Sequence, residues 1–490
     1  MALKAALFNI NDVFPVGQRF AEPSLGLGYI KSYYEKYSLV PESVSINILK
    51  NEIGAELKRL RPDIIGISSV TQDYSNAVTY AKQLKAGGCR ALILIGGIHI
   101  SSLPESLDPV FDAAVIGEGE ETCREFFEAV AQSGPGREGW AQIKGLVFYD
   151  GDKIIYTQKR PLIENLDSLP HPFRSPGTCR GFTSMLTSRG CPFRCSFCSS
   201  SSFWGNKIRY NSAAYVVEEM RELVKRCGVR HISIWDDLFA ININRISEIA
   251  HLINKERALF RAVSFGITAK ASLIEEELCG LLRQINVTRV AVGLESGSER
   301  ILKVIKGKEA SLEGSRNAVR LLKKYGFNVT AGFILGLPGE TKADMQATYQ
   351  FIKSLPLDGG GSSLAVPYPK TSLWDYAIKM KLADIKMDFS KMRLVNNFSL
   401  PPSAYNFILL AQGVPTEEIW RIAGKIQRFF TFRNFISLFN RQTLTLRNIF
   451  LVLRYPRIFL PFVAHILKRL MNTPAACWRK GRFVNKEWAS

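Results

Sequence analysis

Three cysteines within eight residues carry the strongest chemical signal in this sequence. Cys191, Cys195 and Cys198 lie in the run RGCPFRCSFC, with three and then two residues between them. Three thiolates on one loop can reach three corners of a 4Fe–4S cluster, which normally takes four thiolates, so one iron would remain open to a chelating amino acid. A structural zinc site is the alternative, but no nearby Cys or His supplies a fourth ligand at related spacing.

Polar residues also follow several apolar runs downstream of these cysteines. Asp236 lies in the run SIWDD at 233–237, Glu295 and Ser296 stand in GLESG at 293–297, and Ile334 lies in GFILGLPGE at 332–340. A carboxylate between glycines at a strand end is typical of a ligand contact in a β/α barrel. A helix cap for Asp236 and tight turns for the glycines are the alternative interpretations.

Six apolar runs separated by helical segments must position these residues. The expected strands cover residues 184–188, 231–236, 264–269, 289–295, 328–336 and 362–367. Chemistry concentrated at strand ends predicts a full or partial barrel, and we expect a partial (β/α)6 barrel over residues 181–385.

An earlier series of apolar runs predicts a separate α/β domain. Its expected strands are residues 5–10, 43–49, 63–70, 91–97 and 112–118, with amphipathic helices between them. Buried runs of this kind indicate parallel strands covered on both faces. We therefore expect a doubly wound, Rossmann-like domain over residues 1–140, with its ligand outside the carboxyl ends of the strands. A hairpin at 142–157, turning at Asp150 and Gly151, and a Pro-rich stretch at 160–177 predict a linker over residues 141–180.

The pattern C-x3-C-x-Phe-C, with Phe197 as its aromatic residue, resembles the signature of the radical S-adenosylmethionine (SAM) superfamily. The resemblance implies that Cys191, Cys195 and Cys198 hold a 4Fe–4S cluster. It also implies that further residues bind SAM: Asp236 at the methionyl amino group, Glu295 and Ser296 at the ribose and carboxylate, and Ile334 against the adenine, with Phe197 in the same cofactor-binding set.

Three segments of the first domain resemble the cobalamin-binding domain found in one branch of that superfamily. They are PSLGLGYI at 23–30, GGIH at 96–99 and GEGEET at 117–122. The resemblance implies that Ser69, Gly97 and Glu118 line a cobalamin pocket. Many cobalamin domains carry Asp-x-His-x-x-Gly after the first strand, but this chain has no His there, so ligation of cobalt by that His is excluded. His99 follows the fourth strand, where we expect a hydrogen bond within the loop rather than a cobalt ligand.

This resemblance implies a cobalamin-dependent radical SAM enzyme. Cleavage of SAM would give a 5′-deoxyadenosyl radical, and C-methylation of an unactivated carbon is the expected reaction. Alternatives are oxidative cyclisation or ring rearrangement, a degenerate domain that has lost cobalamin, and a scaffold with a vestigial cluster. RNA methylthiolation would need three further clustered cysteines, whereas Cys89, Cys123 and Cys179 are scattered. An electron donor such as flavodoxin or ferredoxin is the expected redox partner.

The charge excess lies mainly at the end of the chain. The 490 residues carry 64 Lys and Arg against 44 Asp and Glu, and residues 391–490 contribute sixteen of these bases and only three acids. We expect a helical, basic C-terminal region over residues 386–490 that caps the barrel; peripheral contact with a membrane is the alternative, and nucleic acid is disfavoured. Nine cysteines are too few for a disulfide scaffold, and no apolar run is long enough to span a bilayer. These features predict a cytoplasmic protein. If its C-terminal region contacts a membrane, we expect it at the inner face of that membrane. The expected substrate is a small molecule, lipid-like or anionic.

Overall fold

The computed structural model describes residues 2–13, 24–174, 179 and 181–438. The chain divides into two units, residues 1–430 and residues 431–490. The first unit contains both predicted α/β domains. The second unit is described only as far as Leu438, where the last described helix ends.

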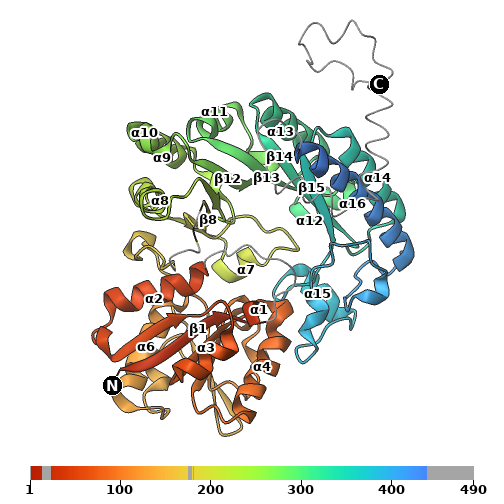
Figure 1. The fold of residues 1–490 in the computed structure, drawn as a ribbon. Coiled ribbons are helices and arrows are strands. Elements are labelled where there is room, and N and C mark those ends of the chain that lie inside the picture. The colour runs from red at the N-terminus through yellow and green to blue at the C-terminus, as the bar shows by residue number, and fades with distance from the viewer. Residues whose placement is uncertain (1, 14–23, 175–178, 180, 439–490) are drawn as a thin grey trace, which may run out of the picture. The chain divides into compact units, whose positions relative to one another are not determined.

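The first sheet is built on five parallel strands in the order β2-β1-β3-β4-β5. The strands are β1 (Leu3–Asn9), β2 (Val44–Ile48), β3 (Ile64–Ser68), β4 (Leu92–Gly96) and β5 (Ala113–Val115). Helices cover both faces, which is why these strands are almost continuously apolar (Figure 1). They are α1 (Ile10–Val13), α2 (Leu25–Tyr37), α3 (Ile53–Leu60), α4 (Tyr74–Ala86), α5 (Ile98–Ser102) and α6 (Gly119–Ser133). The order is that of a doubly wound fold, as predicted.

The predicted hairpin extends this sheet. Strands β6 (Leu146–Asp150) and β7 (Lys153–Tyr156) pair antiparallel with each other, and β6 pairs antiparallel with β5. The prediction of the turn was shifted by one residue. Asp150 is still in the strand opposite Lys153, and only Gly151, at φ +57°, has the left-handed backbone.

The second sheet has six parallel strands in the order β15-β14-β13-β12-β11-β8. They are β8 (Phe182–Met185), β11 (His231–Ile234), β12 (Ser264–Ala269), β13 (Val287–Glu295), β14 (Asn328–Leu335) and β15 (Gly359–Leu364). In the described part of the chain β8 and β15 are the two edges of this sheet, so the barrel is partial, as expected.

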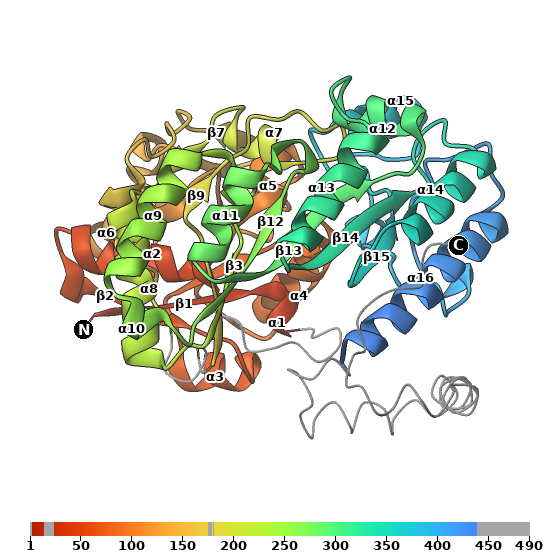
Figure 2. The ribbon, with the colours of Figure 1, turned by 90° about the horizontal axis from the view of Figure 1, so that it is seen from above.

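Most helices of this domain lie on the outer side of the curved sheet (Figure 1), and Figure 2 shows α11, α13 and α14 beside β12 to β15. The outer helices are α8 (Ala213–Cys227), α9 (Ile243–Lys255), α10 (Arg257–Phe260), α11 (Glu276–Gln284), α13 (Leu312–Lys324) and α14 (Lys342–Ser354). Two further helices, α12 (Glu299–Lys306) between β13 and β14 and α15 (Ser372–Lys379) after β15, pack instead against the apolar core of the first sheet. Six of the helices of this domain begin at a Ser, Thr or Asn whose side chain accepts a backbone N–H: Ser212, Asn242, Ser298, Ser311, Thr341 and Thr371. These caps fix where each helix starts after its loop.

A two-stranded antiparallel ribbon precedes the barrel helices. It consists of β9 (Ser188–Arg189) and β10 (Arg209–Tyr210), and the cysteine run and helix α7 (Ser200–Trp204) lie between its strands. Strands of two residues are too short to produce a periodic pattern, so the sequence did not predict this ribbon.

The C-terminal region differs in part from the helical expectation. Residues 386–415 are mostly loop with short 3-10 turns at Phe389–Met392 and Pro402–Ala404, and α16 (Thr416–Leu438) is the long helix of the described region. Its residues Ile419, Ile422 and Ile426 are buried in the core of the barrel, as a cap requires. The helical stretch expected at 446–471 lies outside the described residues. None of the helices in the described part of the chain is long and apolar enough to cross a membrane.

Candidate active site

The cysteine run forms a loop between β9 and α7. Cys191, Cys195 and Cys198 are all partly exposed, and none is in a disulfide. Ser196 anchors the loop on both sides, since its N–H donates to the carbonyl of Ile305 at 2.9 Å and its carbonyl accepts from the N–H of Leu373 at 3.2 Å. The loop is therefore held between the end of α12 and the start of α15.

Two ammonium groups act on this loop. Burial raises the pKa of all three thiols, that of Cys198 to about 11, whereas Lys306 and Lys270 lower the pKa of Cys195. Lys270 lies 3.0 Å from the ring centroid of Phe193. Positive charge here favours the thiolates that an iron–sulfur cluster needs. In the described part of the chain, no three His, Cys, Asp or Glu side chains are close enough to hold one metal ion, and this includes the three cysteines of the loop.

Asp236 binds the chain just before the cysteine loop. One carboxylate oxygen accepts the Thr187 N–H at 2.6 Å, and the other accepts the hydroxyls of Thr187 and Ser188 at 2.5 and 2.7 Å. With both oxygens so engaged, the geometry favours a positioning role over the expected contact with an amino group. Asp237, which the sequence analysis did not select, accepts the N–H of Gly190 at 3.3 Å and raises the pKa of Cys191 and Cys198.

Glu295 occupies a β-bulge at the end of β13. The register shifts between Gly293 and Glu295, and Glu295 has φ +66°, a left-handed backbone that is costly for a residue with a side chain. Lys306 lies 3.6 Å from its carboxylate and also donates to the carbonyl of Gly293. Burial raises the pKa of Glu295, and Lys306 opposes this effect. A strained, buried carboxylate with one lysine fits a ligand-binding position.

The remaining residues of the SAM prediction fall into two groups. Ser296 is fully buried, and its hydroxyl accepts the N–H of Ser298 at 3.1 Å and contacts Thr348 at 3.3 Å. The geometry therefore favours a structural role in the turn rather than a direct contact. Phe197 and Ile334 are half-buried and pack against the same apolar cluster, so the cysteine loop and the end of β14 share one core.

A cavity of about 490 Å³ lies at the carboxyl ends of β1, β3, β4 and β5. On the sheet side its lining is mainly apolar, with Leu7, Ile67, Leu94, Ile95 and Val115 beside a few glycines and the polar side chains of Asn9 and Ser68. On the other side it is closed by residues of the barrel domain: Leu186, Arg189, Phe203, Trp204 and Trp235. Its position is the one that the doubly wound fold predicts for a ligand.

The cavity contains two of the three predicted cobalamin residues. Gly97 and Glu118 line it, but Ser69 does not, and the preceding Ser68 does. Ser69 lies outside the lining because it packs beneath Gly97: at φ +102°, a Cβ on Gly97 would lie 2.5 Å from the Ser69 carbonyl oxygen. His99 is fully buried outside the cavity, with its Nε2 3.0 Å from the Ser106 hydroxyl, so it makes the expected loop hydrogen bond.

Comparison with known proteins agrees with this geometry. The family model for the radical SAM superfamily matches residues 185–352, and the model for the B12 binding domain matches residues 19–127. An uncharacterized methyltransferase of Pyrococcus horikoshii is 33% identical over 374 residues, which cover 74% of this chain and 79% of that protein. The chain belongs to the cobalamin-binding radical SAM enzymes. The two matched domains imply SAM, a 4Fe–4S cluster and cobalamin as the cofactors of this radical SAM enzyme.

Relatives of this radical SAM enzyme differ in their named reactions. An anaerobic magnesium-protoporphyrin IX monomethyl ester cyclase of Cereibacter sphaeroides is 28% identical, and the match covers 76% of this chain but only 61% of the cyclase. The solved structure of the methyltransferase TsrM of Kitasatospora setae, with cobalamin and a [4Fe-4S] cluster bound, has a TM-score of 0.64. At 20% identity, with 78% of this chain and 76% of TsrM covered, that likeness shows the fold.

Several charged residues of the site were missed from the sequence. Lys270 and Lys306 stand among many lysines on helices and strand ends, and nothing in their spacing distinguishes them. Arg189 and Glu120 had a signal, because they flank residues that were selected: Arg189 opens the cysteine run, and Glu120 follows Glu118 in GEGE. Arg209 lies in a ribbon that was not predicted.

Proposed function

We propose that this enzyme is a C-methyltransferase that uses cobalamin and SAM on an unactivated carbon of a small molecule. Cys191, Cys195 and Cys198 would hold the cluster, and Glu295, with Lys306, would bind SAM beside it. The cavity at the first sheet would hold cobalamin. When bound, the cofactors supply a SAM-derived radical and a transferable methyl group; the protein contributes binding, orientation and exclusion of water.

The position of the cavity carries this proposal. Arg189 lines it, and Cys191 follows only two residues later in the chain. Trp204, at the end of the helix after the cysteine loop, closes it. A ligand in this cavity therefore lies beside the loop that would carry the cluster, as transfer between two cofactors on one substrate requires.

The proposal divides the chain at the boundaries expected from its sequence. Residues 1–140 would form the cobalamin domain, 141–180 the hairpin and linker, 181–385 the SAM barrel and 386–490 the C-terminal region. Because β6 pairs with β5, the hairpin part of the 141–180 segment belongs to the first sheet, and the linker proper begins after β7.

The visible spectrum of the purified protein tests both cofactor assignments. After anaerobic reconstitution with iron, sulfide and hydroxocobalamin, we expect iron–sulfur and corrinoid absorption together, at one 4Fe–4S cluster per chain. Absence of the corrinoid bands would favour the degenerate-domain alternative. Two clusters per chain would favour methylthiolation instead.

An isotope experiment distinguishes methylation from cyclisation. Cyclisation is the second candidate reaction because the chain is similar to a magnesium-protoporphyrin ester cyclase. With SAM deuterated in its methyl group, a C-methyltransferase gives a labelled product, whereas a cyclase gives an unlabelled one. A candidate substrate panel should contain small molecules, both anionic and lipid-like.

Two partners belong to the same proposal. SAM cleavage needs an electron, for which a flavodoxin or ferredoxin would serve. The excess of basic residues at the end of the chain suggests peripheral contact with an anionic membrane.

A further inference from the structure

Four buried charges connect the cavity at the first sheet to the segment that carries the cysteines. Arg189 donates through one terminal nitrogen to Glu118 at 2.5 Å and through the other to Glu120 at 2.6 Å. Arg209 donates to both oxygens of Glu118, at 3.1 and 2.9 Å. All four residues are at most 7% exposed, so these are ion pairs removed from water.

The ribbon that carries the two arginines depends on these acids. Arg189 and Arg209 are direct cross-strand partners in the β9–β10 pair, where two like charges destabilise pairing. Burial lowers the pKa of Arg189, but Glu120 and Glu118 more than offset this and raise it. Removing one partner of a buried pair leaves an uncompensated charge, so the ribbon and the β5–α6 segment hold each other in place.

The linker and the cavity wall join the same network. The backbone of Ile163 donates its N–H to Glu118 at 2.7 Å and accepts from Arg209 at 2.5 Å. Arg189, Glu118 and Glu120 all line the cavity, and Arg189 lies over the rings of Tyr29 and Trp204. A ligand filling the cavity therefore meets the network itself.

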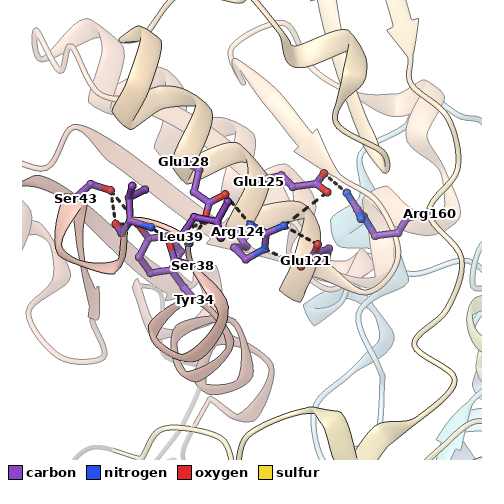
Figure 3. A network of polar contacts seen from close by, with 10 residues as sticks. Tyr34, Ser38, Leu39, Ser43, Glu121, Arg124, Glu125, Glu128 and Arg160 are labelled. Carbon is purple, nitrogen blue, oxygen red and sulfur yellow. Dashed lines mark hydrogen bonds and ion pairs between the residues drawn. The ribbon is translucent and has the colours of Figure 1, made fainter.

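The main chain carries this constraint directly into the cysteine loop. Gly190 follows Arg189 at φ +103°, and a Cβ there would lie 2.2 Å from the carbonyl oxygen of Lys207. A backbone packed so closely cannot absorb a shift of Arg189 without moving Cys191. Figure 3 shows a second network farther along α6, in which Arg124 donates to Glu128, and Glu128 also accepts from Ser38 and Leu39 of the segment after α2.

We infer that the Glu118–Glu120–Arg189–Arg209 network couples occupancy of the cavity to the position of the cysteine loop, so that cluster and corrinoid bind cooperatively. The inference rests on the proposed cofactor sites and adds a link between them. Arg189 is a positioning residue here: its planar fork donates to two carboxylates through two separate terminal nitrogens, whereas a lysine has a single nitrogen with no fixed fork.

The test measures that cooperativity in the full chain without using turnover. The dissociation constant of hydroxocobalamin is measured by its visible spectrum for protein without and with a reconstituted cluster, and the first value is divided by the second. Couplings of this kind are at least about fivefold, so the wild-type ratio should reach about 5 or more. E120Q and R189K should lower the ratio to near one, while their iron content confirms that a cluster is present.

E128Q is the matched control, because it makes the same substitution in the same helix, at a carboxylate that also binds one arginine. It should keep the wild-type ratio. The inference is overturned by a wild-type ratio of one, or by E120Q and R189K with the wild-type ratio; R189K, which conserves charge, decides alone if E120Q is insoluble. Failure of the wild type to hold iron or hydroxocobalamin would instead contradict the proposed cofactor sites.

Discussion

The three cysteines of the loop are expected to bind a cluster, whereas the cysteines elsewhere in the chain are not. Cys198→Ala removes one of three thiols from a loop anchored at Ser196, so we expect loss of most cluster iron and of 5′-deoxyadenosine formation from SAM. Cys89→Ala is the control, since Cys89 packs against the first domain's core and lies far along the chain from the loop. Full iron content and activity in Cys198→Ala would contradict the cluster assignment.

Glu340 should make the stability of the folded protein depend on pH. Burial raises its pKa to about 7, although the N–H groups of Gly336 and Leu337 bind one of its oxygens and lower it; the other oxygen has no hydrogen-bond partner. The folded state thus prefers the protonated acid, and the stability from this preference is lost as pH rises from the ordinary pKa of the unfolded chain through 7.

Glu340→Gln cannot ionise and should escape that loss. Between pH 5 and pH 8 we expect the variant to gain about 2 kcal/mol in free energy of unfolding relative to the wild type. Unfolding measured at both pH values checks this. Glu138→Gln, at an exposed carboxylate, should show no such change, and an equal pH response in wild type and Glu340→Gln would refute the prediction.

Among the elements, the β9–α7 connection is where backbone geometry matters most for the site. Gly190→Ala places a Cβ against the Lys207 carbonyl, so the loop must shift. We expect it to lose most cluster iron on reconstitution. Gly205→Ala is a matched control: Gly205 ends α7 at φ +73° with no atom within 4 Å of its Cβ position, so it bears only the backbone strain, about 1 kcal/mol. Equal iron content in the two variants would contradict the prediction.

The elements themselves divide into those with a strong sequence signal and those without one. Strands such as β12 and β13 were predicted to within a few residues because their buried positions carry Val, Ile, Leu, Phe and Ala at the spacing of a strand. The β9–β10 ribbon was missed because its stability comes from acids some seventy to ninety residues away, which no local pattern reports. The expectation of helix over residues 386–415 was wrong, since this segment is mostly loop. The adjacent prolines at 401 and 402 are incompatible with a helix interior.

For the whole molecule, the sequence predicted which residue types lie at the site better than it predicted the contacts between segments far apart in the chain. The cysteine spacing and the GEGE run identify residues near both proposed cofactor sites. That both oxygens of Asp236 are engaged, and that Ser69 packs under Gly97 while Ser68 lines the cavity, depends on the three-dimensional packing of distant segments. Such roles follow only once the two domains are placed against each other.

The basic residues at the end of the chain predict binding to an anionic membrane. Within residues 416–430 the apolar face of α16 is buried in the barrel core and the bases Arg421, Lys425 and Arg428 are exposed, so charge rather than apolar insertion must drive lipid contact by this part. We expect the full chain to float with phosphatidylcholine vesicles that contain phosphatidylserine, and not with phosphatidylcholine alone.

Each base near such a surface contributes about 1 kcal/mol, so K468Q/R469Q should weaken binding by about tenfold or more. K153Q/K159Q, which neutralises two exposed lysines near the hairpin, should leave binding unchanged, and added salt should release the wild type. Binding that ignores lipid charge, or no binding at all, would contradict the predicted contact with an anionic membrane.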